Sequence, residues 1–73
     1  MLNKASIHPH LGHNQWSVEF TTGSIESAED MQNKYGTPDY TDHNYHHVTL
    51  NWVFDNIKEA AEFKRAINNG ENN

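Results

Sequence analysis

Histidine is the residue type in this chain that could do chemistry most directly, with six copies among 73 residues. The copies fall into two groups, His8, His10 and His13 in HPHLGH, and His43, His46 and His47 in HNYHH. Neutral imidazoles are good ligands for zinc, nickel and copper. The composition therefore raises the hypothesis of a small histidine-rich metal-binding protein.

The spacing of the histidines argues against a metal site within either group. If a strand begins near residue 45, His46 and His47 point to opposite faces of the sheet, and His43 lies roughly 13 Å from His47. His8 and His10 share a strand face about 6.6 Å apart, so they need a third ligand from across the sheet. We therefore expect no cofactor. The alternative is a zinc or nickel site at His8, His10 and His47, which requires these two segments to lie side by side.

The sequence offers little for catalysis. It has no cysteine, which excludes thiol nucleophiles, disulfides and thiolate metal sites. Its serines lie in no nucleophile-elbow context, and it contains no glycine-rich phosphate loop. A domain near the smallest size that is stable on its own also has few residues with which to enclose a pocket. We predict that the protein is not an enzyme.

Charge and hydropathy exclude two classes of partner. Ten acidic residues against five basic ones give a formal charge of −5. Direct binding to nucleic acid depends on clustered lysine and arginine, so this balance disfavours it. The sequence shows neither the apolar run of a signal peptide nor that of a membrane span. We expect a cytoplasmic protein that binds neither nucleic acid nor membrane.

Two segments show the alternation of a half-buried strand, and each is followed by a helical pattern. Residues 15 to 22, QWSVEFTT, and residues 48 to 54, VTLNWVF, alternate apolar and polar side chains. We expect one helix from a cap at Ser24 to a stop at Gly36, with an apolar face that begins at Ile25. A second helix is expected to open at Asn56, to carry an apolar face that begins at Ile57, and to run out at residues 68–70.

The expected fold class is α+β. The weaker segment LNKASIH is predicted to add an edge strand that ends at Pro9, and residues 37–44 are predicted to form a loop. The predicted architecture is a small three-stranded sheet, two-stranded without that edge strand, with both helices packed on one face. The order is strand, strand, helix, strand, helix. We expect one domain over residues 1–70 and a frayed tail at 71–73.

The core must be built largely from aromatic residues, because a chain of this length is near the limit of independent stability. The candidates are Trp16, Phe20, Trp52, Phe54 and Phe63. A homodimer is one way for so small a core to gain stability.

Two tyrosines flank the loop that carries the second histidine group. Tyrosine and histidine beside Asp and Asn are typical of protein interfaces, because large amphipathic rings have few rotamers to freeze. We predict a partner-binding surface on this loop and on the solvent-facing side of the sheet, from which His43, Tyr45 and His47 are expected to project. Its residues are Tyr40, Asp42, His43, Tyr45, His47, Glu19 and Asn51. For Tyr45, packing over the edge of the core is an equal alternative.

Two hypotheses of different class follow. The first is a small acidic, non-catalytic protein-binding module that acts as a regulator or inhibitor of another protein. Size and composition alone suggest the kind of protein that phages and other mobile elements carry. The second is the histidine-rich metal-binding protein.

Overall fold

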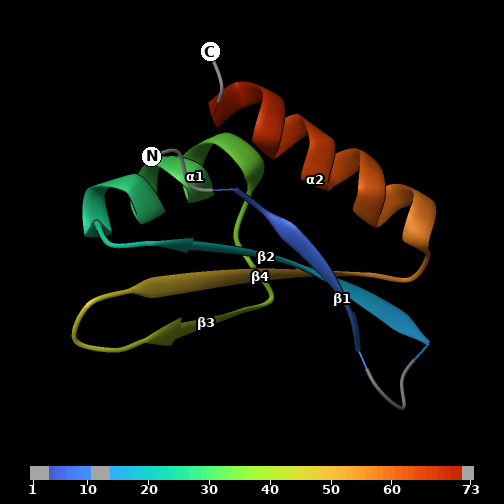
Figure 1. Cartoon of the computed structure of the whole chain (residues 1–73), viewed down its shortest axis with the longest axis horizontal. Coiled ribbons are helices and arrows are strands. Elements are labelled where there is room, and N and C mark those ends of the chain that lie inside the picture. The colour runs from blue at the N-terminus through green and yellow to red at the C-terminus, as the bar shows by residue number, and fades with distance from the viewer. Residues whose placement is uncertain (1–3, 11–13, 72–73) are drawn as a thin grey trace.

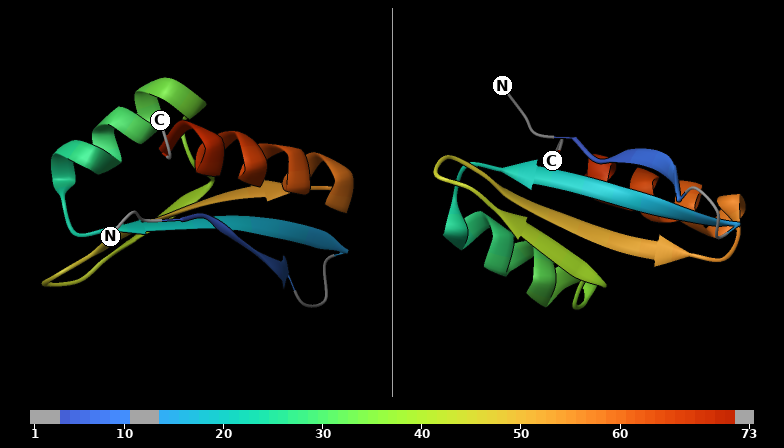
Figure 2. Two further views of the ribbon diagram at one scale, coloured as in Figure 1. Left: turned by 45° about the horizontal axis from the view of Figure 1, so that its top comes forward. Right: turned by 90° about the horizontal axis from the view of Figure 1, so that it is seen from below.

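The described residues form one antiparallel sheet with two helices on one face (Figure 1). The computed structural model describes residues 4–10 and 14–71. Its elements are β1 (Ser6–His10), β2 (Gln15–Thr22), α1 (Ile25–Tyr35), β3 (Tyr40–His43), β4 (Val48–Phe54) and α2 (Ile57–Glu71). The strand order in the four-stranded sheet is β1-β2-β4-β3. The α+β class is thereby confirmed, and the view from below in Figure 2 shows the strands in front of the helices.

The sheet has a strand that the sequence did not predict. β3 lies inside the expected loop and pairs antiparallel with β4, from Tyr40 opposite Asn51 to His43 opposite Val48. All four residues of β3 are exposed, so neither face produces the apolar alternation by which a strand is recognised. The prediction of three strands, and of one strand between the helices, was therefore wrong.

The core lies between the helices and the central strands β2 and β4. Val18 pairs with Trp52 and Phe20 with Leu50, and their side chains on this face are buried. Helix α1 contributes Ala28 and Met31, and α2 contributes Ala60 and Ile67. Of the predicted aromatic core, Phe20 and Trp52 are buried, whereas Trp16, Phe54 and Phe63 are half-buried and pack against its margin.

The first residue of each helix departs from the apolar pattern. Ile25 is 68% exposed and Ile57 is 52% exposed, and each is the first residue of its helix. The predicted caps are present: Ser24 Oγ accepts a hydrogen bond from the Ser27 amide at 3.2 Å, and Asn56 Oδ1 accepts one from the Glu59 amide at 2.8 Å.

Helix α2 runs to Glu71, past its expected end, while residues 72–73 lie outside the described chain. Asn68, expected near the helix stop, holds the segment before β1 instead. The Ala5 amide donates to Asn68 Oδ1 at 2.7 Å, and Asn68 Nδ2 donates to the Ala5 carbonyl at 3.3 Å. This side-chain amide thus substitutes for a strand neighbour. No helix in the described part of the chain is long and apolar enough to cross a membrane.

Candidate functional site

The stretch TDHNYHHV forms the tip of the β3–β4 hairpin. The Asn44 amide donates to the His47 carbonyl at 3.0 Å. The side-chain oxygen of Asn44 accepts from the amides of His46 and His47, each at 2.8 Å. Asparagine favours such turns because its side chain can bond backbone groups two and three residues ahead. One residue therefore fixes the path of the loop.

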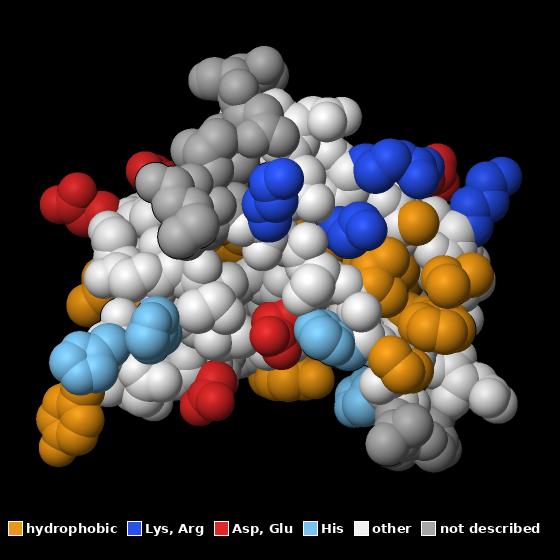
Figure 3. Space-filling model, in the orientation of Figure 1, with side chains coloured by type: hydrophobic (Ala, Val, Ile, Leu, Met, Phe, Trp, Pro, Cys, Tyr) orange, Lys and Arg blue, Asp and Glu red, His pale blue; other side chains and the backbone are white. Residues whose placement is uncertain are grey.

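Tyr45 projects fully from this loop, with 101% of its surface exposed. Beside it, the loop and the β2–α1 turn enclose a hollow of about 150 Å³, which Ile25 helps to line. The turn approaches closely, since a Cβ added at Gly23 would lie 3.4 Å from the His46 carbonyl oxygen. Figure 2 shows the turn and the loop at the same end of the sheet, and Figure 3 shows histidines beside a projecting hydrophobic side chain there.

The loop position corrects two expectations about the histidines. His46 and His47 lie in the loop before β4, so the alternation of a strand does not point them to opposite faces of the sheet. The centroids of their rings are 6.3 Å apart. His43 pairs with Val48, whose buried side chain lies on the helix side of the sheet. Paired residues share a face, so His43 also belongs to the helix side and does not project from the other one.

The remaining predicted partner-binding residues form a separate group on the face away from the helices. Tyr40, Asn51 and Glu19 lie in one cross-strand row, and Asp42 pairs with Thr49 in the next row on that face. Asn51 is buried and accepts a hydrogen bond from Ser17 Oγ at 3.0 Å. It is therefore a structural residue, while Tyr40 and Asp42 are exposed and Glu19 is half-buried.

This face is less open than expected. His10 and Tyr40 come from opposite edges of the sheet, yet their ring centroids lie 6.2 Å apart. Ser17 and Asn51 lie on the two strands between them, and each is only 6% exposed. The contact was missed because it depends on strand order, which one sequence does not reveal.

The structure does not bring the three proposed metal ligands together. His8 pairs with Ser17 and His10 with Gln15, near the start of β2, whereas β4 begins opposite Thr22 at its end. The start of β4 is thus roughly 17 Å along the sheet from His8 and roughly 23 Å from His10 at the rise of a strand, so His47 does not lie across from His8 and His10. Among residues 4–10 and 14–71, no three or more His, Asp or Glu residues form a group that could hold a metal ion. His13 lies outside the described residues.

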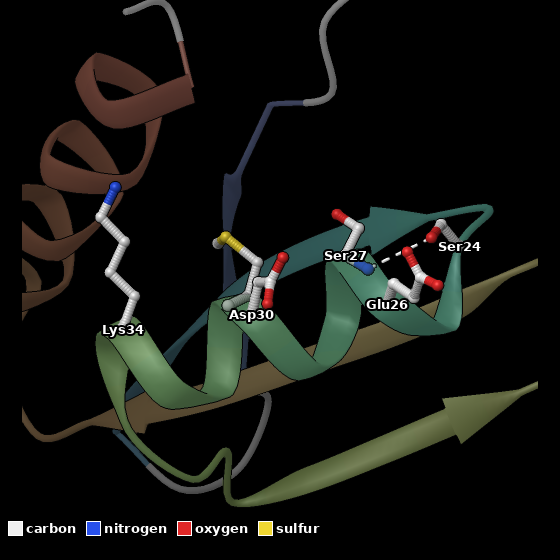
Figure 4. Close-up of a pocket in the computed structure, with 6 residues that line it drawn as sticks. Ser24, Glu26, Ser27, Asp30 and Lys34 are labelled. Carbon is white, nitrogen blue, oxygen red and sulfur yellow. Dashed lines mark hydrogen bonds between the residues drawn. The ribbon is translucent and has the colours of Figure 1, made fainter.

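A second hollow, of about 350 Å³, runs along α1 (Figure 4). Its described lining is Ser24, Glu26, Ser27, Asp30, Met31 and Lys34. Ser24 Oγ is already used as the helix cap, and the described lining includes no histidine that could activate a serine. The carboxylates and the lysine follow one another at intervals of four along one helix, which is the usual pattern of a solvated helix face.

Comparisons with models of protein families, with curated proteins and with solved structures found no match. The exposed rings and the hollow at the end of the β3–β4 hairpin are the most distinctive arrangement in the described chain. We call this the hairpin-tip surface, made of Ile25, His43, Tyr45, His46 and His47. Sequence reasoning missed two residues of this surface. The helical spacing of Ile25 predicted a core position, and the predicted strand placed His46 on the sheet face opposite His47.

Proposed function

We propose that this chain is a non-catalytic protein-binding module that uses the hairpin-tip surface as its contact region. The observation that carries the proposal is the full exposure of Tyr45 on a loop that the Asn44 side chain fixes. A tyrosine on a loop whose backbone is already fixed loses little backbone entropy on binding, its side chain has few rotamers to freeze, and it buries a large amphipathic ring. Tyrosine is accordingly one of the residues that dominate the energy of protein interfaces.

The surroundings of Tyr45 also support a protein partner. Ile25 adds an exposed apolar side chain, and exposed imidazoles surround the pair, which matches the apolar centre and polar rim of an interface. The hollow between them, about 150 Å³, is smaller than the few hundred Å³ typical of a small-molecule pocket. A wider hollow of about 440 Å³ lies beside Tyr45, but its described lining is only His43, Asn44 and Tyr45 of the one loop, which does not surround a small molecule. A protein surface fits this site better than a substrate does.

The role proposed for the module is regulation or inhibition of its partner. A chain that binds without catalysing a reaction acts by blocking a site or by holding a partner in one conformation. The face carrying Tyr40 and Asp42 begins beside the hairpin tip, so it extends the contact region for a partner of ordinary interface size.

Affinity capture tests the proposal. The wild-type chain is immobilised and exposed to lysate of the source organism, beside the variants Tyr45→Ala and Asn33→Ala. Asn33 is an exposed residue near the far end of α1 and controls for truncation of a surface side chain. We expect one dominant partner on the wild type and on Asn33→Ala, and its loss from Tyr45→Ala at unchanged circular dichroism. Equal capture by both variants would contradict the proposal.

A further inference from the structure

Helix α2 carries three basic residues, on its outer side and on the side toward β1. Asn68 marks the side that faces the segment before β1, because it is bonded to Ala5. At 100° per residue, Lys64 lies one turn before Asn68 on that side, and Lys58 and Arg65 lie on the outer side of the helix, opposite the buried Ala60 and Ile67. Glu62 lies beside them, four residues after Lys58 and three before Arg65, and Glu59 lies on the flank away from Asn68. Figure 3 shows the basic side chains gathered over α2.

Lys4, exposed and next to Ala5, extends this group at the start of β1. We call Lys4, Lys58, Lys64 and Arg65 the basic strip. Within the described part of the chain, none of the four makes an ion pair or a side-chain hydrogen bond with a carboxylate. These cations stay unpaired although the chain has ten acidic residues against five basic ones.

Apolar side chains lie next to the basic strip. Trp16 pairs with Phe54 at the margin of the core, where both are half-buried, and Ile57 opens α2 just beyond β4 with half of its surface exposed. Figure 3 shows hydrophobic side chains gathered directly below the basic ones at this end of the molecule. Ile57 therefore adds exposed apolar surface beside the basic strip.

We infer that the basic strip and the apolar residues beside it dock an acidic segment of another protein. Its carboxylates would face the four unpaired cations, and its apolar side chains would cover Ile57 and Trp16. Charge complementarity of this kind sets partner choice and speeds association. The surface lies at the β1 edge of the sheet, opposite the β3 edge, and does not depend on the hairpin tip.

Three other kinds of partner fit the basic strip less well than an acidic segment does. Addition of a strand along β1 is hindered, because Pro9 has no N–H and both backbone groups of Ala5 are bonded to Asn68. A two-fold contact with a second copy would set the same patch against itself, four cations against four. A nucleic acid or an anionic lipid surface carries a denser negative charge than a short acidic segment does, so the net charge of −5 repels it more strongly.

The test uses a blocked synthetic peptide with glutamates and leucines at helical spacing, and the same peptide with glutamines in place of glutamates. Trp16 reports binding through acrylamide quenching of fluorescence, because Trp52 is only 5% exposed. We expect the glutamate peptide alone to shield Trp16 at low salt. The double variant Lys58→Glu/Arg65→Glu should weaken binding by about tenfold or more.

Two variants and two further ligands make the test decisive. Lys34→Glu makes the same charge change on α1 and should leave the affinity for the glutamate peptide unchanged. Tyr45→Ala alters the hairpin-tip surface and should also leave that affinity unchanged, which shows that the two surfaces act separately. No shielding, equal binding of the glutamine peptide, or an equal loss in Lys34→Glu would overturn the inference. Tighter binding of a single-stranded oligonucleotide or of phosphatidylserine vesicles, lost in the double variant, would overturn it in favour of a polyanion.

Discussion

The rings of His10 and Tyr40 lie 6.2 Å apart, centroid to centroid, although the two residues belong to strands at opposite edges of the sheet. Two strands lie between them, so the sheet must curve for the rings to meet. The contact lies on the face away from the helices and accompanies the burial of Ser17 and Asn51 there. A face that no helix covers is thus partly closed by its own edge residues.

Truncation of Tyr40 should destabilise the fold through this contact. Tyr40→Ala removes the ring pair and admits water toward the Ser17–Asn51 hydrogen bond, so we expect the free energy of unfolding to fall by about 1 kcal/mol. Urea denaturation followed by circular dichroism measures the change. Tyr45→Ala is the matched control and should stay within about 0.5 kcal/mol of the wild type. Equal losses in the two variants would show that the His10–Tyr40 contact contributes nothing.

Asn68 should contribute more to stability than its neighbour Asn69. Asn68→Ala removes both hydrogen bonds to Ala5 and leaves partly buried backbone groups unsatisfied, which should cost about 1–3 kcal/mol. Asn69 is exposed, so Asn69→Ala should change the free energy of unfolding by less than about 0.5 kcal/mol. Thermal or urea unfolding of the two variants makes the comparison, and a cost at Asn69 as large as at Asn68 would contradict it.

Gly70 is predicted to reverse the usual effect of replacing a helical glycine. In a helix interior, alanine is more stable than glycine by about 1 kcal/mol. Here the added Cβ would lie 2.5 Å from Tyr35 Oη, which donates a hydrogen bond to the Ala66 carbonyl. We therefore expect Gly70→Ala to lower the free energy of unfolding.

The double variant isolates the cause of the effect at Gly70. In a Tyr35→Phe background the hydroxyl is gone, so Gly70→Ala should become neutral or stabilising. Urea unfolding of the wild type, the two single variants and the double variant gives the coupling between the two positions. If alanine changes stability by the same amount in both backgrounds, the close approach is not the reason for glycine at this position.

Asn44 should control the order of the hairpin loop. Asn44→Ala removes the acceptor for the amides of His46 and His47, so both amides should exchange with solvent faster. Asn44→Asp keeps an acceptor oxygen at the same place and should retain slow exchange. Hydrogen exchange monitored by NMR gives the rates. Equal rates in the wild type and Asn44→Ala would mean that the Asn44 side chain does not order the loop.

The sequence predicted the elements that have a buried face. The alternation of Val18 and Phe20 with polar neighbours predicted β2, and side chains with known capping chemistry, such as Ser24, marked the helix starts. β3 has no buried face, so the period of two never appears in it. Tyr45 was identified as a contact residue, with packing over the core as an equal alternative. Only the three-dimensional path of the loop places Tyr45 in solvent and Ile25 beside it.

Site-directed photocrosslinking tests the central claim most directly. Benzoylphenylalanine is placed at position 45 in one protein and, as a matched control, at position 33 in another, and each is irradiated in lysate of the source organism. The proposed function predicts one dominant crosslinked protein from position 45, competed away by unlabelled wild-type chain, and no such product from position 33. Absence of a competed product at position 45, or the same product from both positions, would contradict the claim that the hairpin tip binds a protein partner.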